Sequence, residues 1–484
     1  MRLRLFNTLT RSLEPFEPLE HGRAGVYACG PTIYDHAHVG NFRSFVFYDL
    51  VHRYLEWKGY DVRFVMNLTD VDDKTIRAAV AEGKTISEYT EPFAQAILEE
   101  ADALGIRRAD RYPRATAYVD EMIALVERLL EKGHAYRTDD GSVFFDITSF
   151  PEYGKLSRKN LDEARRGERV SEDEYGKDDV RDFALWKASK PEDREAGAAW
   201  PAPWGEGRPG WHLECSAMSL AEVGETLDIH LGGEDLVFPH HEDEIAQSEG
   251  ATGKPFVRYW LHVRHLRFAD EKMSKSRGNT VTVQDLLEQG VDPAALRHQL
   301  LSAHYRSELA FGREGLEGSG RAVQRLIDFR DRVEEVHTDP SAAISGIGGK
   351  AEEALERFEG ALADDLNVPG GLGALFSFVS EGNGILDRKG DRVPPEEAER
   401  VLEVLGSMDE VLGLLEVAGQ SRTVDAETRH WIEDRIGERE EARRSKDFSR
   451  ADAIRDELAE RGIVLEDSSR GTRWKHVGTR PLVG

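Results

Sequence analysis

The pattern of hydrophobic and polar positions is clearest in the first 77 residues. Residues 26–28 form a short apolar run, residues 42–57 carry apolar positions at helical spacing, and residues 61–68 form a second apolar run. A strand, a helix and a strand in this order make a βαβ unit, whose fixed handedness builds parallel sheets. We therefore predict an α/β fold with a doubly wound, Rossmann-like parallel sheet.

The stretch between the first strand and the helix, residues 29–41, has the composition of a ligand-binding turn. It contains the thiol of Cys29, the imidazoles of His36 and His38, and Gly40. In an open parallel sheet such a turn lies at the carboxyl end of a strand, where the next helix presents free N–H groups and the positive end of its dipole. This turn is predicted to bind an anionic ligand.

The sheet pattern resumes after a long interruption. Residues 84–134 have helical periodicity, whereas about 136–209 contain short strands, a charged stretch and a proline-containing loop. Residues 227–230 and 241–249 then predict a returning strand and a helix. We interpret residues 1–310 as one sheet domain that carries an insertion over about 136–209.

The part of the chain after this domain is predicted to be mainly helical. Apolar residues recur at helical spacing over 311–418, which predicts a small helical bundle, and residues 346–349 are expected to form a loop within it. A polar linker over 419–425 is predicted to separate the bundle from a small C-terminal domain over 427–484. There we expect two charged helices, beginning at about residues 429 and 449, and a strand over 463–465.

Composition narrows the class of protein. The chain has 484 residues, 39% hydrophobic and 32% charged, with only two cysteines. It contains no apolar run of about 18 residues and no signal-peptide pattern, so we expect a cytoplasmic protein without a membrane partner. A net charge of −27 argues against a general nucleic-acid coat protein. From Arg429 onward, however, 13 basic residues balance 12 acidic ones, so a polyanion would meet the least repulsion there.

A metal site is one interpretation of the two cysteines. Zinc takes Cys, His and carboxylate ligands, and the chain offers Cys29, Cys215 and a segment in which His240 and Glu244 stand four residues apart. On a helix these two side chains share one face. A lone cysteine is more often a small buried hydrophobe, and a His and a Glu four apart usually mark an exposed helix face. Spacing alone leaves both interpretations open.

A second candidate site is the segment 271–279, which contains Lys272, Lys275 and Arg277 among small residues. A mobile cationic loop of this kind can stabilise charge on a transferring phosphoryl group. Taken alone it would be an ordinary solvated loop. Together with the turn at 29–41, it favours phosphoryl chemistry.

Two short motifs and several longer ones resemble a known family. Residues 38–41 (HVGN) and 272–276 (KMSKS) resemble the two signature motifs of class I aminoacyl-tRNA synthetases, in that order. Residues 27–32, 67–74, 210–218 and 238–248 resemble, more specifically, the cysteinyl-tRNA synthetase family. The resemblance covers almost the full length. Asn41 departs from the pattern of many class I enzymes, which have a second histidine there and could carry a positive charge.

The resemblance implies roles for individual residues. One zinc ion per chain would be bound by Cys29, Cys215, His240 and Glu244. ATP, with its Mg²⁺, would be bound by His38, Gly40, Asn41 and Lys275, and the catalytic residues would be His38, Lys272 and Lys275. The amino acid would be bound by Thr69, Trp211, His230 and Asp235.

The implied reaction is activation of L-cysteine by ATP to cysteinyl-adenylate, followed by transfer to the 3′ end of cysteine tRNA. The metal would select the substrate thiolate over serine. The bundle would contact the tRNA arm, and the C-terminal domain would read the anticodon with Trp431, Trp474 or nearby arginines. A monomer is expected. Two alternatives remain at this point: a ligase that joins cysteine to an amino sugar, and a non-catalytic zinc or thiol sensor on the same fold.

Overall fold

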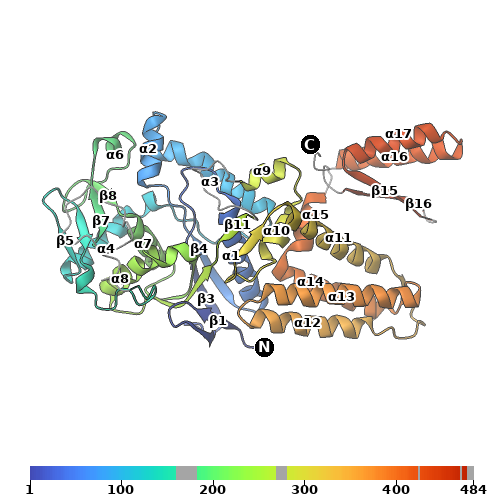
Figure 1. The fold of residues 1–484 in the computed structure, drawn as a ribbon, viewed down its shortest axis with the longest axis horizontal. Helices are drawn as coiled ribbons and strands as arrows, with labels where there is room; N and C mark the ends of the chain where they lie inside the picture. The colour runs from blue at the N-terminus through green and yellow to red at the C-terminus, as the bar shows by residue number, and fades with distance from the viewer. Residues whose placement is uncertain (160–181, 269–280, 423–425, 469–470, 477–484) are drawn as a thin grey trace.

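The computed structural model describes residues 1–159, 182–268, 281–422, 426–468 and 471–476. Its central sheet has four parallel strands in the order β10 (Val257–Val263), β9 (Leu227–Gly233), β3 (Arg23–Ala28) and β4 (Asp61–Met66) (Figure 1). The strand order reverses direction between β3 and β9, so the predicted doubly wound parallel sheet is confirmed. In such sheets ligands bind at the carboxyl edge next to the reversal.

The two faces of the sheet belong to different hydrophobic cores. Val26 and Ala28 of β3 pack in one core with α1 (Val39–Trp57), whereas Tyr27 and Cys29 pack in the other with α7 (Trp211–Glu222) and α8 (His240–Thr252). Successive side chains of a strand point to opposite faces, which explains this alternation. Cys29 is therefore placed on the α7 and α8 face by its position in the strand pattern.

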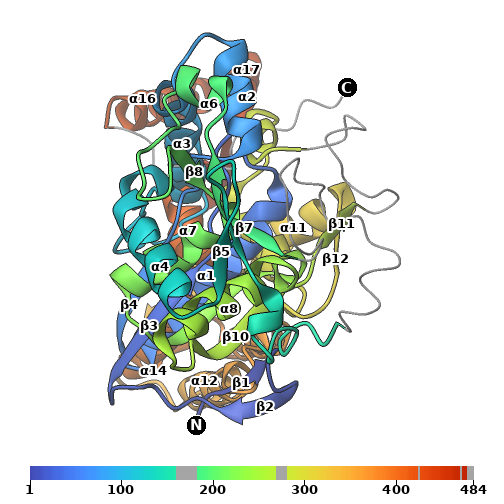
Figure 2. The ribbon, with the colours of Figure 1, turned by 90° about the vertical axis from the view of Figure 1, so that its left-hand side faces the viewer.

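The insertion forms a separate antiparallel sheet. Its strands are β5 (Ala135–Arg137), β6 (Val143–Phe145), β7 (Phe183–Ala188) and β8 (Gly207–Pro209), hydrogen-bonded in that order. The predicted helical stretch over 84–134 divides into α3 (Ile86–Ala103) and α4 (Val119–Glu131), and it is preceded by a further helix, α2 (Asp73–Ala81), which the sequence did not indicate. Figure 2 shows the insertion sheet facing the viewer, with α4 beside it.

Short elements complete the sheet domain. They are β1 (Arg4–Asn7), β2 (Ser12–Pro15), η1 (Ala115–Ala117), η2 (Ile147–Ser149), α6 (Pro191–Glu195), η3 (Glu234–Val237), β11 (Leu266–Phe268), α9 (Val283–Glu288) and β12 (Leu309–Phe311). None of the helices in the described part of the chain is long and apolar enough to cross a membrane.

A helical bundle packs against α1. Its helices are α10 (Pro293–Leu301), α11 (Arg313–Glu335), α12 (Ile347–Ala363), α13 (Val368–Lys389), α14 (Pro395–Leu412) and α15 (Leu414–Arg422), and two-residue strands β13 (His337–Thr338) and β14 (Arg392–Val393) join its loops. The buried side chains of the bundle and of α1 form one continuous core.

Two expectations for the bundle are wrong. The predicted loop 346–349 is mostly the first turn of α12, because Ile347 and Ala351 are buried in the core and hold this turn in place. The predicted linker 419–425 is helical up to Arg422, because α15 buries Leu414 and Val417 against the rest of the protein. Gly105 permits this contact: it has φ +63°, and a Cβ there would lie 2.3 Å from Val417. In both places tertiary packing overrides the local composition.

A buried group of three charged residues, which we call the arginine clasp, joins the sheet domain to the bundle. Asp49 of α1 accepts hydrogen bonds from Arg53 Nε at 2.9 Å and from Arg297. Arg297 Nε also donates to Leu412 O at 2.7 Å and its Nη1 to Leu104 O at 3.0 Å, while Arg53 Nη2 donates to Gly105 O at 2.6 Å. The clasp thus satisfies carbonyl groups that the ends of α3 and α14 leave unpaired.

The C-terminal elements form a unit with a core of its own. They are α16 (Ala426–Arg444), α17 (Phe448–Glu460) and the hairpin β15 (Ile463–Ser468) with β16 (Gly471–His476). Its buried aliphatic side chains form a cluster separate from the other two cores: Ile432, Ile436, Ile454, Leu458, Ile463 and Leu465. Both expected helices and the expected strand are present, and β16 is an additional strand. Figure 1 shows the unit at one end of the molecule, beyond the bundle.

Candidate active site

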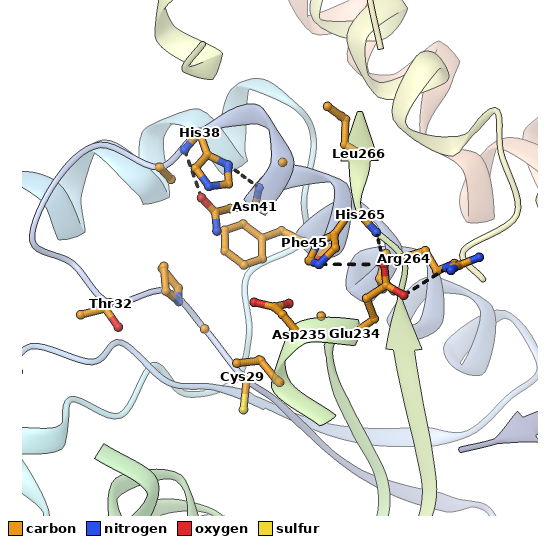
Figure 3. A pocket seen from close by; sticks show the side chains of 18 of the residues that line it. Cys29, Thr32, His38, Asn41, Phe45, Glu234, Asp235, Arg264, His265 and Leu266 are labelled. Carbon is orange, nitrogen blue, oxygen red and sulfur yellow. Dashed lines mark hydrogen bonds and ion pairs between the residues drawn. The ribbon is translucent and has the colours of Figure 1, made fainter. Parts of the chain in front are cut away.

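A cavity of about 1230 Å³ opens at the carboxyl edge of the sheet, beside the ends of the paired strands β3 and β9. It is lined by the turn after β3, by η3 after β9, and by residues between β10 and β11. Figure 3 shows Cys29 and Asp235 at one end of this cavity and His38 with Asn41 at the other. The predicted turn therefore lines a cavity at the strand reversal that is large enough for a nucleotide and an amino acid.

The four residues of the predicted metal set meet beneath Cys29, which is the one of them that lines the cavity. We call this buried group the floor of the cavity. Cys29 Sγ and Cys215 Sγ are 3.8 Å apart, and His240 Nε2 lies 3.1 Å from Glu244 Oε1. All four side chains are buried, and their ligand atoms lie within 4.8 Å of one another. They come from the end of β3, from α7 and from one turn of α8. This geometry could hold a metal ion.

A second set of residues shares two members with the first. His241 Nε2 lies 3.3 Å from Cys29 Sγ, and His230 Nε2 lies 3.0 Å from Glu244 Oε2, so Cys29, His230, His241 and Glu244 also meet the distance condition for a metal site. Sequence reasoning missed His241, although it stands in the same run as His240. Its Nδ1 is 2.8 Å from His262 Nε2, so His241 is held from behind by β10.

Electrostatics favour the deprotonated form of two of the four candidate ligands, Cys215 and Glu244, and the protonated form of the other two, Cys29 and His240. A hydrogen bond from Cys29 lowers the pKa of the Cys215 thiol to about 6, although burial opposes this, and burial raises the pKa of Cys29. Burial would raise the pKa of Glu244, but the rings of His230 and His240 lower it to about 2. Thiolate, imidazole and carboxylate are the donors that a borderline-soft divalent cation takes in proteins. The donor set therefore fits such an ion.

Residues behind the floor orient His240. His240 Nδ1 lies 2.9 Å from His212 Nδ1, His212 Nε2 lies 3.4 Å from Asp243 Oδ2, and Asp243 accepts a hydrogen bond from Tyr153. On the cavity side, Trp211 stacks on His240 with ring centroids 4.4 Å apart. Such outer contacts fix the direction in which a ligating imidazole points.

The other end of the cavity is the N-terminus of α1. His38 is the N-cap residue: its Nδ1 accepts from Asn41 N at 3.2 Å, and Asn41 Oδ1 accepts from His38 N at 3.1 Å. Asn41 thus serves the helix cap, a role that sequence reasoning did not assign. Val39 N donates to Val281 O at 2.9 Å. This hydrogen bond holds Val281, which stands shortly after the lysine-containing segment 271–279, beside the N-terminus of α1. Lys272 and Lys275 themselves lie outside the described residues.

Comparison with known proteins finds family models and relatives that match almost the whole chain. The model of the "tRNA synthetases class I (C) catalytic domain" matches residues 15–321, that of the "DALR domain" matches 357–416, and that of the "Cysteinyl-tRNA ligase anticodon binding domain" matches 435–474. A cysteine–tRNA ligase of Symbiobacterium thermophilum is 48% identical over 98% of this chain and 100% of its own length. The chain belongs to the cysteinyl-tRNA synthetase family. A cysteine–tRNA ligase of Alkalilimnicola ehrlichii is 47% identical, over 98% and 99%.

The fold is shared more widely than the cysteinyl-tRNA synthetase family. A Mycobacterium tuberculosis methionyl-tRNA synthetase in complex with methionyl-adenylate superposes with a TM-score of 0.58 and 16% identity, over 81% of this chain and 90% of that one. At this identity the likeness establishes the class I synthetase fold alone.

The four residues that the family resemblance places in an amino-acid pocket divide into two pairs. Trp211 and Asp235 line the cavity. Thr69 and His230 are buried at 2% and 0% exposure and lie behind its wall, Thr69 paired with the backbone of Thr32 and His230 bonded to Glu244. Several lining residues were not singled out from the sequence, among them Tyr34, Lys74 and Glu234. Tyr34 lies in the turn at 29–41 and Lys74 ends the family-like stretch at 67–74, and these two stretches were the signal that could have found them.

Proposed function

We propose that this member of the cysteinyl-tRNA synthetase family catalyses the ATP-dependent attachment of L-cysteine to cysteine tRNA. Cysteine and ATP would first form cysteinyl-adenylate and pyrophosphate, and the 3′-terminal ribose of the tRNA would then take the cysteinyl group. The full-length similarity to cysteine–tRNA ligases is the observation that carries the proposal. The similarity extends through the C-terminal unit, which neither an amino-sugar ligase nor a sensor would need, so these alternatives are not favoured.

Zinc is the metal that the floor of the cavity fits, with Cys29, Cys215, His240 and Glu244 as its ligands. When bound, zinc supplies a Lewis acid that favours a thiolate over a hydroxyl group, a distinction that a pocket of fixed size makes only about 10- to 200-fold. Because Cys29 lines the cavity, the site faces the substrate on that side.

The protein's own groups would bind and orient the remaining parts of the two substrates. The N-terminus of α1, with His38, Gly40 and Asn41, would attract the phosphates of ATP and its Mg²⁺. Lys272 and Lys275 would complete the charge stabilisation on the α-phosphate. The carboxylate of Asp235, which lines the cavity, suits the substrate ammonium group, and Trp211 closes the site beside His240. Thr69 and His230 would support this pocket from behind.

We also propose a separate role for each region of the chain. Residues 1–310, with the insertion over about 136–209, would carry out both chemical steps, and residues 311–418 would contact the tRNA arm. Residues 427–484 would read the anticodon. There Trp431 has the guanidinium group of Arg461 over its ring at 4.3 Å, an arrangement suited to stacking on a base. A monomeric state and a cytosolic location stay predictions from the sequence.

The proposal is tested by two assays on the same zinc-containing preparation. We expect cysteine-dependent pyrophosphate exchange far above that with serine, and charging of purified cysteine tRNA. Deleting residues 427–484 should abolish most charging and spare the exchange. Selective exchange without any charging by the full chain would favour the amino-sugar ligase, and no exchange at all would favour the sensor.

A further inference from the structure

The hydroxyl group of Tyr27 is buried beside the floor of the cavity. Tyr27 stands two residues before Cys29, so both side chains leave the end of β3 on the α7 and α8 face of the sheet. The Tyr27 side chain is fully buried, and among the described residues its hydroxyl has no hydrogen-bond partner. A buried hydroxyl without a partner costs stability, so its position beside a ligand-binding site points to a role there.

Tyr27 faces the ionisable groups of the floor. Its ring meets that of His230 edge-on, with centroids 5.2 Å apart, and His230 is in turn bonded to Glu244. Tyr27 also shares one hydrophobic core with Cys29 and Cys215. Burial, followed by the charges of Cys215 and Cys29, raises the pKa of the Tyr27 hydroxyl well above its usual value. The hydroxyl therefore keeps its proton and can act as a hydrogen-bond donor.

Three of the four candidate metal ligands have a hydrogen-bonding partner outside the ligand set. These pairs are Cys29 Sγ with His241 Nε2 at 3.3 Å, Glu244 Oε2 with His230 Nε2 at 3.0 Å, and His240 Nδ1 with His212 Nδ1 at 2.9 Å. The fourth ligand, Cys215, is different. In the part of the chain that the structure describes, its Sγ contacts members of the set itself, among them Cys29 Sγ at 3.8 Å. Metal ligands are usually oriented by outer partners, and Cys215 is the one that lacks such a partner.

We propose that the Tyr27 hydroxyl donates a hydrogen bond to the thiolate of Cys215 when zinc is bound. This inference rests on the zinc site of the proposed function. The hydrogen bond is charge-assisted and supplies the outer partner that Cys215 lacks. It withdraws electron density from the Cys215 sulfur, which leaves the metal more attractive to the substrate thiolate. Tyr27 does not line the cavity, so it is a positioning residue that acts through Cys215.

The test compares Tyr27→Phe with Tyr54→Phe in the full-length chain. Tyr54 of α1 is the matched control, because it is fully buried in the other large core and its hydroxyl has no partner among the described residues either. In competition with a chelator, we expect Tyr27→Phe to lower zinc affinity about tenfold and Tyr54→Phe to stay within about twofold of the wild type. At saturating zinc, the KM for cysteine in pyrophosphate exchange should rise in Tyr27→Phe, while the KM for ATP stays unchanged.

Two further measurements do not depend on activity. Co²⁺ fits the same ligands as zinc, and its thiolate charge-transfer absorption should move to longer wavelength in Tyr27→Phe, because the sulfur loses a hydrogen bond that stabilises its electrons. The Tyr54→Phe spectrum should match that of the wild type. Without metal, Tyr27→Phe should resist urea at least as well as the wild type, since the hydroxyl that it removes has no partner in that state.

Several results would overturn the inference. An unchanged zinc affinity or an unchanged cobalt spectrum in Tyr27→Phe would each do so. Equal losses in the two variants, or a lower stability of metal-free Tyr27→Phe, would assign the hydroxyl to packing instead. A wild-type chain that binds no zinc would overturn the proposed metal site, and this inference with it. A wild-type chain that binds zinc no better than Tyr27→Phe would overturn this inference alone.

Discussion

Two regions of the molecule are stabilised in different ways: the sheet domain with its bundle, and the C-terminal unit. In the first, the arginine clasp ties α1 to the ends of α3 and α14, and one hydrophobic core runs from the sheet into the bundle. In the second, the aliphatic cluster around Leu458 is separate from both larger cores. The proposed adenylate-forming site is therefore built into one continuous body, whereas the proposed anticodon reader is stabilised by its own contacts.

This difference fits what the two regions are proposed to do. Positioning cysteine, ATP and a metal requires side chains fixed to a fraction of an ångström, and α1, whose N-cap is His38, is anchored through Asp49 to the bundle. Reading an anticodon loop requires a unit that can adjust to its RNA. The first two predictions that follow test this separation, and the next two test how charge and hydrogen bonds act within the sheet domain.

The largest effect is expected from Arg297→Met. Arg297 is fully buried, and its removal takes a hydrogen bond from the Leu412 and Leu104 carbonyls and leaves Asp49 with the side chain of Arg53 and the backbone N–H of Arg107 as partners. We expect a loss of about 3–5 kcal/mol in the unfolding free energy of the sheet and bundle, measured by urea denaturation. Arg313→Met, which removes an exposed arginine paired with Glu317, should cost less than about 1 kcal/mol. Equal effects of the two substitutions would contradict a structural role for the clasp.

Leu458→Ala should act on the C-terminal unit alone. Leu458 is fully buried in the small aliphatic cluster, and truncating a buried leucine costs about 2–5 kcal/mol. We expect an early, separate unfolding transition and reduced tRNA charging, with pyrophosphate exchange unchanged. Phe448→Ala, at an exposed apolar position of the same helix, is the control. A single transition shifted as a whole would show that the two regions unfold together.

Glu100→Gln should stabilise the sheet and bundle in a pH-dependent way. Burial raises the pKa of Glu100 from 4.5 to about 7, so its carboxyl group binds more protons in the folded than in the unfolded state between these values. Wild-type stability therefore falls as the pH rises through this window. The variant should gain about 2 kcal/mol more at pH 8 than at pH 5, at 1.36 kcal/mol per pKa unit.

The control for this experiment is Glu99→Gln, the exposed neighbour on the same helix. It should show the same small effect at both pH values. A gain from Glu100→Gln that is equal at pH 5 and pH 8 would mean that the carboxyl group does not titrate in this range.

The smallest effect is expected from Tyr153→Phe. The Tyr153 hydroxyl donates to Asp243, which faces His212 behind His240, and removing such an outer hydrogen bond lowers metal affinity about 10- to 100-fold. Competition with a chelator measures this change. Tyr136→Phe removes a hydroxyl that donates to Asp182 in the insertion sheet and should leave metal affinity unaltered. A drop of equal size in both variants would point to a general loss of stability.

The local pattern of residues in the sequence was sufficient to predict much of the fold and part of the site. The βαβ order predicted the parallel sheet, and the strand-to-helix turn with Cys29 and His38 lies where such turns bind ligands. The residues of the predicted metal set also meet in space. Each of these inferences rests on residues that are close in the sequence or on a motif whose structure is known from its family.

Long-range contacts account for what the sequence did not reveal. The arginine clasp joins Asp49 to Arg297 and to the end of α14, and no local spacing marks such a pairing. The helical continuation to Arg422 depends on burial of Val417 beside Gly105, which outweighs the polar composition of that segment. His241 was missed because adjacent histidines on a helix point in different directions, and only the placement of β10 shows that His241 also faces Cys29.

The central claim is that the buried group of Cys29, Cys215, His240 and Glu244 beneath the cavity binds zinc and selects cysteine for activation. The most direct measurement compares the wild type with Cys215→Ser for zinc content and for pyrophosphate exchange with cysteine and serine, with Ser216→Ala on the same helix as the control. We predict about one zinc per wild-type and control chain, exchange selective for cysteine, and joint loss of zinc and of at least about 100-fold in exchange in Cys215→Ser. A Cys215→Ser protein that keeps both its metal and its cysteine-dependent exchange would contradict the account.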